Sequence, residues 1–227
     1  MKWLDKGHEF DTAYANMTQK KNYYLFGAGD YGRQFFSALK DEIHIKAYID
    51  NDGNKQGTFI NGLRCLSLDQ ISMANDTGII VTMSQIARSE PVAQLETLGY
   101  IKNKDYFIIE EFISIYHVYK YGKVYFSSIS FLPSTACNLK CRHCLNFNPF
   151  AKQFYVREWN DLIRDVDLFF SCVDHIMLFH VSGGEPLLYN RVADLISYID
   201  SRYGDRIGTL RTVTNGTCPP PVMFLKN

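Results

Sequence analysis

The chain has 227 residues, of which 46% are hydrophobic and 21% charged, and its 24 basic and 24 acidic side chains give a formal net charge of zero. This composition excludes a disordered chain, and without a basic excess or stripe we expect no nucleic-acid partner. No uninterrupted apolar stretch reaches the ~18 residues of a membrane span, and the polar N-terminus lacks the apolar segment of a signal peptide. We therefore expect no membrane association and a cytoplasmic location, where thiols stay reduced.

The first predicted element is a short apolar strand, residues 23–26, which leads directly into the loop GAGDYG. Apolar residues at helical spacing follow the loop, and an alternating strand over residues 43–49 ends at Asp50. Strand, G-x-G-x-x-G, helix, strand and acid is the order of the dinucleotide-binding fingerprint. Its glycines allow a tight turn and a close backbone approach, while the helix N-terminus attracts phosphate. The candidate nucleotide-binding residues are Gly27, Gly29, Gly32 and Asp50; in the alternative interpretation the glycines only form the turn.

Several shorter signals complete the first half of the chain. Residues 58–60 and 63–65 flank Asn61-Gly62, which predicts a hairpin with a type I′ turn. A buried strand over residues 78–83 precedes a helix for which Ser89 is the expected N-cap.

The end of this half is a strand followed by an aromatic-rich connection. We expect the strand over residues 106–109, and we expect residues 110–122 to be a packed segment. A flexible linker would be rich in Gly and Ser or Pro, and this stretch is not.

The motifs FGAGDYG, IDND and KQG, together with the Asn-Gly hairpin, resemble the small Rossmann-like domain at the N-terminus of bacterial sugar O-acyltransferases. The resemblance covers about the first half of the chain and gives an expected domain of residues 1–118. It implies a nucleotide or nucleotide-sugar bound near Gly27, Gly29, Gly32 and Asp50.

The second half, residues 119–227, alternates strands and helices. Strands are predicted over residues 124–132, 175–181 and 209–214, separated by two helices with apolar residues at helical spacing. This alternation predicts an α/β domain with a parallel sheet and right-handed crossovers. In such sheets the chemistry lies at the C-terminal ends of the strands.

Three polar or glycine-rich loops follow these three strands: CNLKCRHC, SGGEP and TNGT. The first carries Cys137, Cys141 and Cys144, and clustered cysteines in a cytosolic chain indicate metal binding or catalysis. A structural zinc site normally has four protein ligands, so three thiols indicate a site with an open position; a catalytic zinc ion is one such possibility. The remaining cysteines are scattered.

The spacing CxxxCxxC after the first strand and GGEP after the second resemble the radical S-adenosylmethionine (SAM) superfamily. The resemblance implies a 4Fe-4S cluster with three irons held by Cys137, Cys141 and Cys144, and the fourth bound by the methionine part of SAM. The implied SAM contacts are His143, Gly183, Gly184, Glu185, Pro186, Thr214 and Asn215. A side chain introduced at Gly183 would then occupy space needed by SAM.

The resemblance also implies a reaction: reductive cleavage of SAM to a 5′-deoxyadenosyl radical, which abstracts hydrogen from a peptide or a sugar-type small metabolite. Electrons would come from a reductant such as a flavodoxin or ferredoxin. Because the cofactors carry the difficult chemistry, no catalytic triad or carboxylate pair is expected. The alternative is a nucleotide- or nucleotide-sugar-binding module with an inactive second half. The family fold is a partial (β/α)6 barrel, so we expect residues 119–227 to be its first half, truncated after the third strand.

Overall fold

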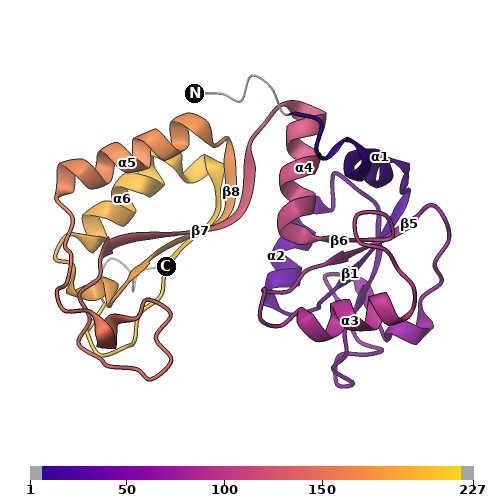
Figure 1. Ribbon diagram of the computed structural model, residues 1–227, viewed down its shortest axis with the longest axis horizontal. Helices are drawn as coiled ribbons and strands as arrows, with labels where there is room; N and C mark the ends of the chain where they lie inside the picture. The colour runs from indigo at the N-terminus through magenta and orange to yellow at the C-terminus, as the bar shows by residue number, and fades with distance from the viewer. Residues whose placement is uncertain (1–6, 221–227) are drawn as a thin grey trace. The chain divides into compact units, whose positions relative to one another are not determined.

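A computed structural model describes residues 7–220, which form two compact α/β units divided after Gly122 (Figure 1). Each unit has its own sheet, and parallel pairing dominates both sheets. The domain boundary expected after residue 118 lies within the last turn of helix α4 (Ile109–Tyr121). That helix ends where Gly122 adopts a left-handed φ of 63°, a conformation that suits glycine.

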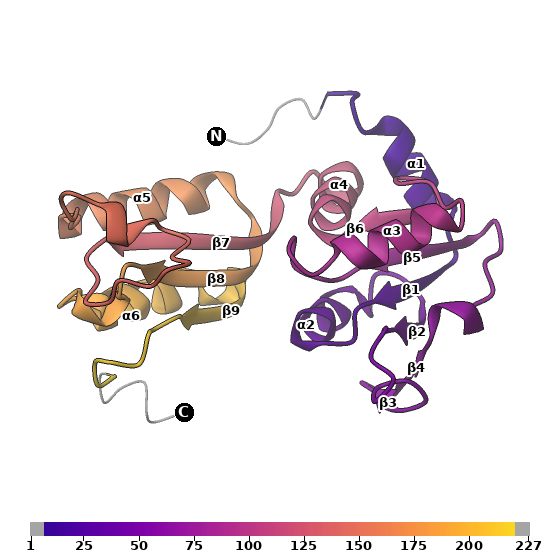
Figure 2. The same ribbon diagram turned by 60° about the horizontal axis from the view of Figure 1, so that its bottom comes forward.

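The N-terminal unit has a six-stranded sheet in the order β3-β4-β2-β1-β5-β6 (Figure 2). The strands are β1 (Asn22–Phe26), β2 (Ile45–Ile49), β3 (Phe59–Ile60), β4 (Leu63–Leu66), β5 (Thr77–Val81) and β6 (Tyr106–Ile108). All neighbours pair in parallel except β3, which forms an antiparallel hairpin with β4. From β1 the chain adds β2 and β4 on one side and then β5 and β6 on the other, so the strand order reverses between β1 and β5. Ligands of open α/β sheets bind at such a switch point.

The hairpin prediction is confirmed. Asn61 and Gly62 have φ values of 52° and 78°, as the two central residues of a type I′ turn require.

Within the described residues this unit has four α-helices: α1 (Asp11–Gln19), α2 (Asp30–Leu39), α3 (Ser89–Thr97) and α4. Successive strand residues point to opposite faces, so Tyr24 and Phe26 pack with Leu95 of α3. On the other face Tyr23 contacts Phe112 of α4 and donates a hydrogen bond to the carbonyl of Met17 in α1. None of the helices within residues 7–220 is long and apolar enough to span a membrane.

Two expectations for this unit are wrong. Helix α1 precedes the strand predicted as the first element; it buries only Ala13 and Met17, so its apolar pattern is too sparse to indicate a helix. Ser89 is the first residue of α3 rather than its cap, and Arg88 occupies the N-cap position without a side-chain capping bond.

The C-terminal unit has three parallel strands in the order β7-β8-β9, as the alternation predicts. The elements are β7 (Tyr125–Ser134), α5 (Trp159–Cys172), β8 (His175–Gly183), α6 (Val192–Tyr203) and β9 (Ile207–Thr212). Helices α5 and α6 cover the same face of the sheet (Figure 1). The core between them contains Leu162 and Val166 of α5, Leu195 of α6, and Phe179 and Val181 of β8.

Candidate functional site

The glycine loop of the N-terminal unit lies between β1 and α2. Gly27 has a φ of 119°, and a Cβ there would lie 2.8 Å from the carbonyl oxygen of Thr82. A Cβ at Gly32 would lie 1.8 Å from the carbonyl oxygen of Gly27. Turn geometry and packing therefore require both glycines. Gly29 differs, because a Cβ there meets no atom within 4 Å and its φ of −81° suits any residue.

Asp50 follows β2 and turns its carboxylate toward the glycine loop. One oxygen accepts from the backbone N–H of Ala28 at 2.9 Å and from the Lys55 ammonium at 3.1 Å. The other accepts from the N–H of Asp52 at 2.9 Å. Burial alone raises the pKa of Asp50, but the N–H groups of Asp52 and Ala28 and the charge of Lys55 outweigh burial, so the pKa lies below its usual value. The carboxylate is thus ionised, and both of its oxygens accept hydrogen bonds from the same chain.

A hollow of about 420 Å³ opens beside this loop, at the C-terminal ends of β1, β2 and β5. Gly27, Gly29 and Asp50 line it, together with Lys55 and Thr82. Gly32 does not, because it packs beneath the loop. The sequence interpretation missed Lys55, although a cation five residues after the acid in the KQG motif was a usable signal.

The cysteine loop of the C-terminal unit begins where β7 ends, and residues 135–147 form neither helix nor strand. Cys137 is half-buried, and its sulfur lies 3.4 Å from the N–H of Leu139. Cys141 is exposed and Cys144 half-buried, and all three thiols are free. Within residues 7–220 no three Cys, His, Asp or Glu side chains are grouped so that they could hold a metal ion. The structure therefore places the three sulfurs on one loop without gathering them around a point.

The second loop, SGGEP, contacts the cysteine loop through its backbone. The N–H of Glu185 donates to the carbonyl of Ala136 at 2.7 Å, and the N–H of Gly184 donates to that of Ser134 at 3.1 Å. Asn146, two residues after the last cysteine of the motif, donates to the carbonyl of Gly183. The sequence interpretation missed this asparagine.

The third loop, TNGT, is joined to the second by the carboxylate of Glu185, whose residue is only 1% exposed. One oxygen accepts from the hydroxyl of Thr214 at 2.7 Å and from the N–H of Leu187 at 3.0 Å. The other accepts from the N–H of Asn215 at 2.7 Å. Both oxygens are therefore bound within the chain.

The third loop also reaches the first. The side-chain amide of Asn215 donates to the side chain of Asn138 at 3.0 Å and lies 3.9 Å from the sulfur of Cys137. Asn138 in turn donates to the hydroxyl of Thr217 at 2.7 Å. The expected convergence of the three loops is thus seen as direct hydrogen bonds between them.

Four more of the implied SAM residues lie in or beside these loops. A Cβ at Gly183 would lie 2.2 Å from the carbonyl oxygen of Ser134, and one at Gly184 would lie 2.0 Å from that of Ala136. The space beside both glycines is therefore filled by the chain, so a side chain at Gly183 would clash with Ser134 whether or not a ligand is bound. His143 is exposed on the loop surface. Pro186 is buried and opens the short helix η3 (Pro186–Leu188).

The two units thus have the α/β class in common, each with polar or glycine-rich loops at the C-terminal ends of parallel strands. No family model matches the sequence, and no curated protein matches it. Among solved structures, one match is UDP-D-quinovosamine 4-dehydrogenase from Vibrio fischeri, at 25% identity over 35% of this chain and 72% of that chain, with a TM-score of 0.29. So low a TM-score does not establish a shared fold.

Proposed function

We propose that the chain is a radical SAM protein. The observation that supports the proposal is the joining of the CNLKCRHC, SGGEP and TNGT loops by hydrogen bonds at one end of a parallel sheet. Under this proposal the C-terminal unit is the first half of a partial (β/α)6 barrel. Cytoplasmic location and a flavodoxin- or ferredoxin-type reductant belong to the same proposal.

The donor chemistry of the cysteine loop fits a 4Fe-4S cluster, because thiolates are the usual protein ligands of such clusters. Cys137, Cys141 and Cys144 would hold it, once the irregular loop draws their sulfurs together. When bound, the cluster would supply the electron that cleaves SAM to a 5′-deoxyadenosyl radical.

The buried carboxylate of Glu185 has a different part in this proposal from the direct SAM contact implied by the resemblance. Since both of its oxygens bind chain donors, it positions Thr214 and Asn215 beside the cysteine loop. The side-chain amide of Asn215 lies 3.9 Å from the sulfur of Cys137.

The test is anaerobic reconstitution with iron and sulfide, followed by iron analysis and assay of SAM cleavage under dithionite. We expect about four irons per chain and release of 5′-deoxyadenosine. Alanine variants of Cys137, Cys141 and Cys144 should each lose the charge-transfer absorbance. The matched controls are Cys65→Ala, Cys172→Ala and Cys218→Ala, which should keep it. Full iron content in the first three variants would refute the proposal.

A second candidate function concerns the N-terminal unit, which we propose is a Rossmann-like module binding a nucleotide or nucleotide-sugar. The supporting observation is Gly29: it is the N-cap of helix α2, it lines the hollow, and neither its φ nor the space around it requires glycine. Glycine at this position of the fingerprint lets the backbone approach a pyrophosphate. Lys55, in the same hollow, supplies a positive charge.

Calorimetric titration with uridine diphosphate tests this candidate. Gly29→Val should weaken binding at least about tenfold, because each hydrogen bond to a charged group contributes roughly 1.5–3 kcal/mol. Gly53→Val is the matched control, since a Cβ at Gly53 also meets no atom within 4 Å but Gly53 does not line the hollow. Equal affinities of the two variants for uridine diphosphate would refute this candidate function and would leave the radical SAM proposal unaffected.

A further inference from the structure

Helices α5 and α6 pack on one face only of the three-stranded sheet. Phe179 and Val181 of β8 and Leu210 of β9 pack toward these helices. Because side chains alternate along a strand, the intervening residues project from the opposite face. Near the C-terminal ends of the strands, these open-face positions are Ser130 of β7, His180 of β8 and Arg211 of β9.

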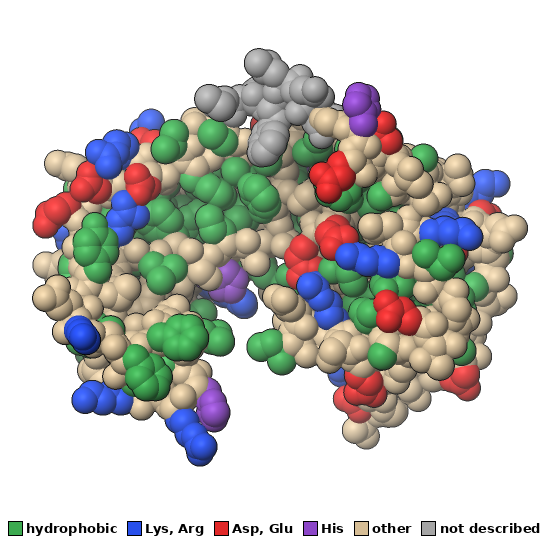
Figure 3. Space-filling model, viewed as in Figure 1, with side chains coloured by type: hydrophobic (Ala, Val, Ile, Leu, Met, Phe, Trp, Pro, Cys, Tyr) green, Lys and Arg blue, Asp and Glu red, His purple; other side chains and the backbone are tan. Residues whose placement is uncertain are grey.

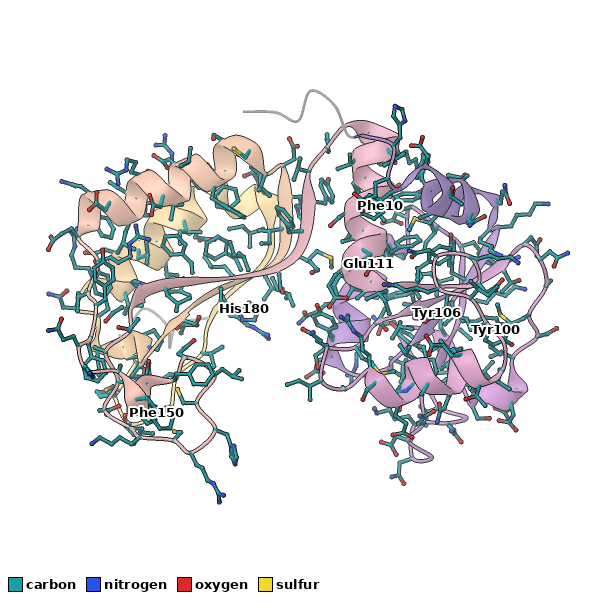
Figure 4. All side chains as sticks on the ribbon, viewed as in Figure 1. Phe10, Tyr100, Tyr106, Glu111, Phe150 and His180 are labelled. Carbon is teal, nitrogen blue, oxygen red and sulfur yellow. The ribbon has the colours of Figure 1, made fainter. Side chains whose placement is uncertain are left out.

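Three polar residues form one row across this open face. Ser130 is the register partner of His180, and His180 is the register partner of Arg211. Neighbouring strands lie ~4.8 Å apart, so the row spans roughly 10 Å from β7 to β9. Figure 4 shows His180 on the side of the sheet away from α5 and α6. The three side chains therefore present their polar atoms side by side.

A hydrogen bond fixes the roles of two members of the row. The Nε of Arg211 donates to Nδ1 of His180 at 3.2 Å. A ring nitrogen that accepts carries no proton, so the neutral imidazole has its N–H at Nε2. Burial and the charge of Arg211 both lower the pKa of His180, which keeps the ring neutral. His180 thus offers one N–H outward and holds the guanidinium in place.

The remaining polar atoms of the row are donors without a carboxylate to satisfy them. Arg211 is exposed and retains the N–H groups of Nη1 and Nη2, and within residues 7–220 it has no ion-pair partner. Ser130 is exposed and adds a hydroxyl. None of the open-face positions of β7, β8 and β9 is Asp or Glu. A fork of N–H groups beside an imidazole N–H and a hydroxyl matches the oxygens of an anion.

We propose that Ser130, His180 and Arg211 form a binding row for the carboxylate or phosphate group of a small organic anion. Arg211 would contact two anion oxygens through its guanidinium, and His180 Nε2 would donate to one of them. This site goes beyond the proposed function, because it requires only the sheet and neither the cluster nor SAM. Under the radical SAM proposal the same anion would be the part of the substrate that the protein grips away from the cysteine loop.

The test uses the full chain and two probes, inorganic phosphate and acetate, at constant ionic strength. Imidazole nitrogen resonances are followed by NMR, and the His180 signals are assigned by their loss in His180→Gln. We expect a saturable shift of the His180 signals with at least one probe. In Arg211→Gln the apparent Kd should rise about tenfold or more, the loss of one or two charge-assisted hydrogen bonds.

Arg64→Gln is the matched control, since Arg64 is likewise an exposed strand arginine but lies on β4 in the other unit. It should bind the probes as the unaltered protein does. Saturation by phosphate alone identifies a phosphate-bearing ligand, and saturation by acetate alone identifies a carboxylate. A linear drift of the His180 signals with both probes, or an Arg211→Gln variant with unchanged Kd, would overturn the proposal. Because iron and SAM are absent from this assay, its outcome is separate from that of the cysteine variants.

Discussion

Each unit ends a parallel strand in a glycine-rich loop, and the two loops use glycine for different reasons. In the C-terminal unit both glycines of SGGEP lie against backbone carbonyls, with added Cβ atoms 2.2 and 2.0 Å from the nearest oxygens. In the N-terminal unit Gly27 and Gly32 are packed in the same way, but Gly29 faces open space. A glycine motif therefore does not by itself indicate a ligand; the packing around each glycine decides.

The acidic residues beside the two loops, Glu185 and Asp50, also differ in their exposure and in what their carboxylates bind. Glu185 is 1% exposed and ties two loops together. The Asp50 side chain is 13% exposed, borders a hollow and shares its charge with Lys55. Glu185 therefore fixes the positions of two loops, whereas part of the Asp50 carboxylate is accessible to a ligand in the hollow. Four predictions, which use six substitutions, test these differences between the two units.

The largest expected effect is that of Gly32→Ala. Its Cβ would lie 1.8 Å from the carbonyl oxygen of Gly27, so helix α2 must shift, and we expect a loss of about 3 kcal/mol. Gly29→Ala, three residues earlier in the same loop, should cost less than about 1 kcal/mol, the usual effect of replacing a glycine N-cap by alanine. Urea unfolding of the two variants measures the difference. Equal losses would show that the loop packs differently from the structure.

Glu185→Gln should have the next largest effect. The amide keeps one acceptor oxygen but turns an NH₂ toward donors, which leaves at least one part-buried N–H or hydroxyl without its acceptor, at a cost of about 2 kcal/mol. Hydrogen exchange at Asn215 should also become faster, because its N–H loses the carboxylate. Exchange at Thr212, whose hydroxyl binds the carbonyl of Val181, should change little. Unchanged protection of the Asn215 N–H in the variant would contradict its hydrogen bond to Glu185.

The alternation of elements predicted both sheets, because hydrophobic periodicity is a local property of the chain. It failed for helix α1, whose burial depends on two residues only. The convergence of the three cysteine-unit loops was also predictable, since parallel strands bring their C-terminal ends to one edge.

Contacts between side chain and distant backbone were not predictable. The side chain of Asn146 donates a hydrogen bond to the carbonyl of Gly183, and the carboxylate of Glu185 accepts hydrogen bonds from Thr214 and Asn215. Those pairings depend on how three loops fold over one another, which no local pattern encodes. The same holds for the Ser130–His180–Arg211 row: strand register, set by packing against α5 and α6, brings these three residues together.

A moderate effect is expected for Asp50→Asn, and it should depend on pH. The folded-state pKa of Asp50 is lowered by the N–H groups of Asp52 and Ala28 and by Lys55, against the opposing effect of burial. Its ionised form therefore stabilises the fold above the unfolded pKa of about 3.9, and this contribution is lost as pH falls through the lower folded pKa. Stability curves should show a deficit on the order of 1 kcal/mol at neutral pH. The deficit should close in acid, and a constant difference would exclude this origin.

The smallest expected effects are those of replacing two threonines, one in each unit. Thr82 directly follows β5, and Thr212 is the last residue of β9. Thr82 is 1% exposed, and its hydroxyl bonds the carbonyls of Phe26 and Gly27 at 3.1 and 3.0 Å. Thr212 is half-buried and bonds the carbonyl of Val181 at 2.9 Å. Thr82→Val should cost about 1 kcal/mol, because water cannot replace the buried donor. Thr212→Val should cost only a few tenths, since the Thr212 hydroxyl is half-buried and its single hydrogen bond is already partly exposed to water. Chemical unfolding of both variants measures the order, and a larger loss at Thr212 would mean that the edge strand β9 is covered in solution.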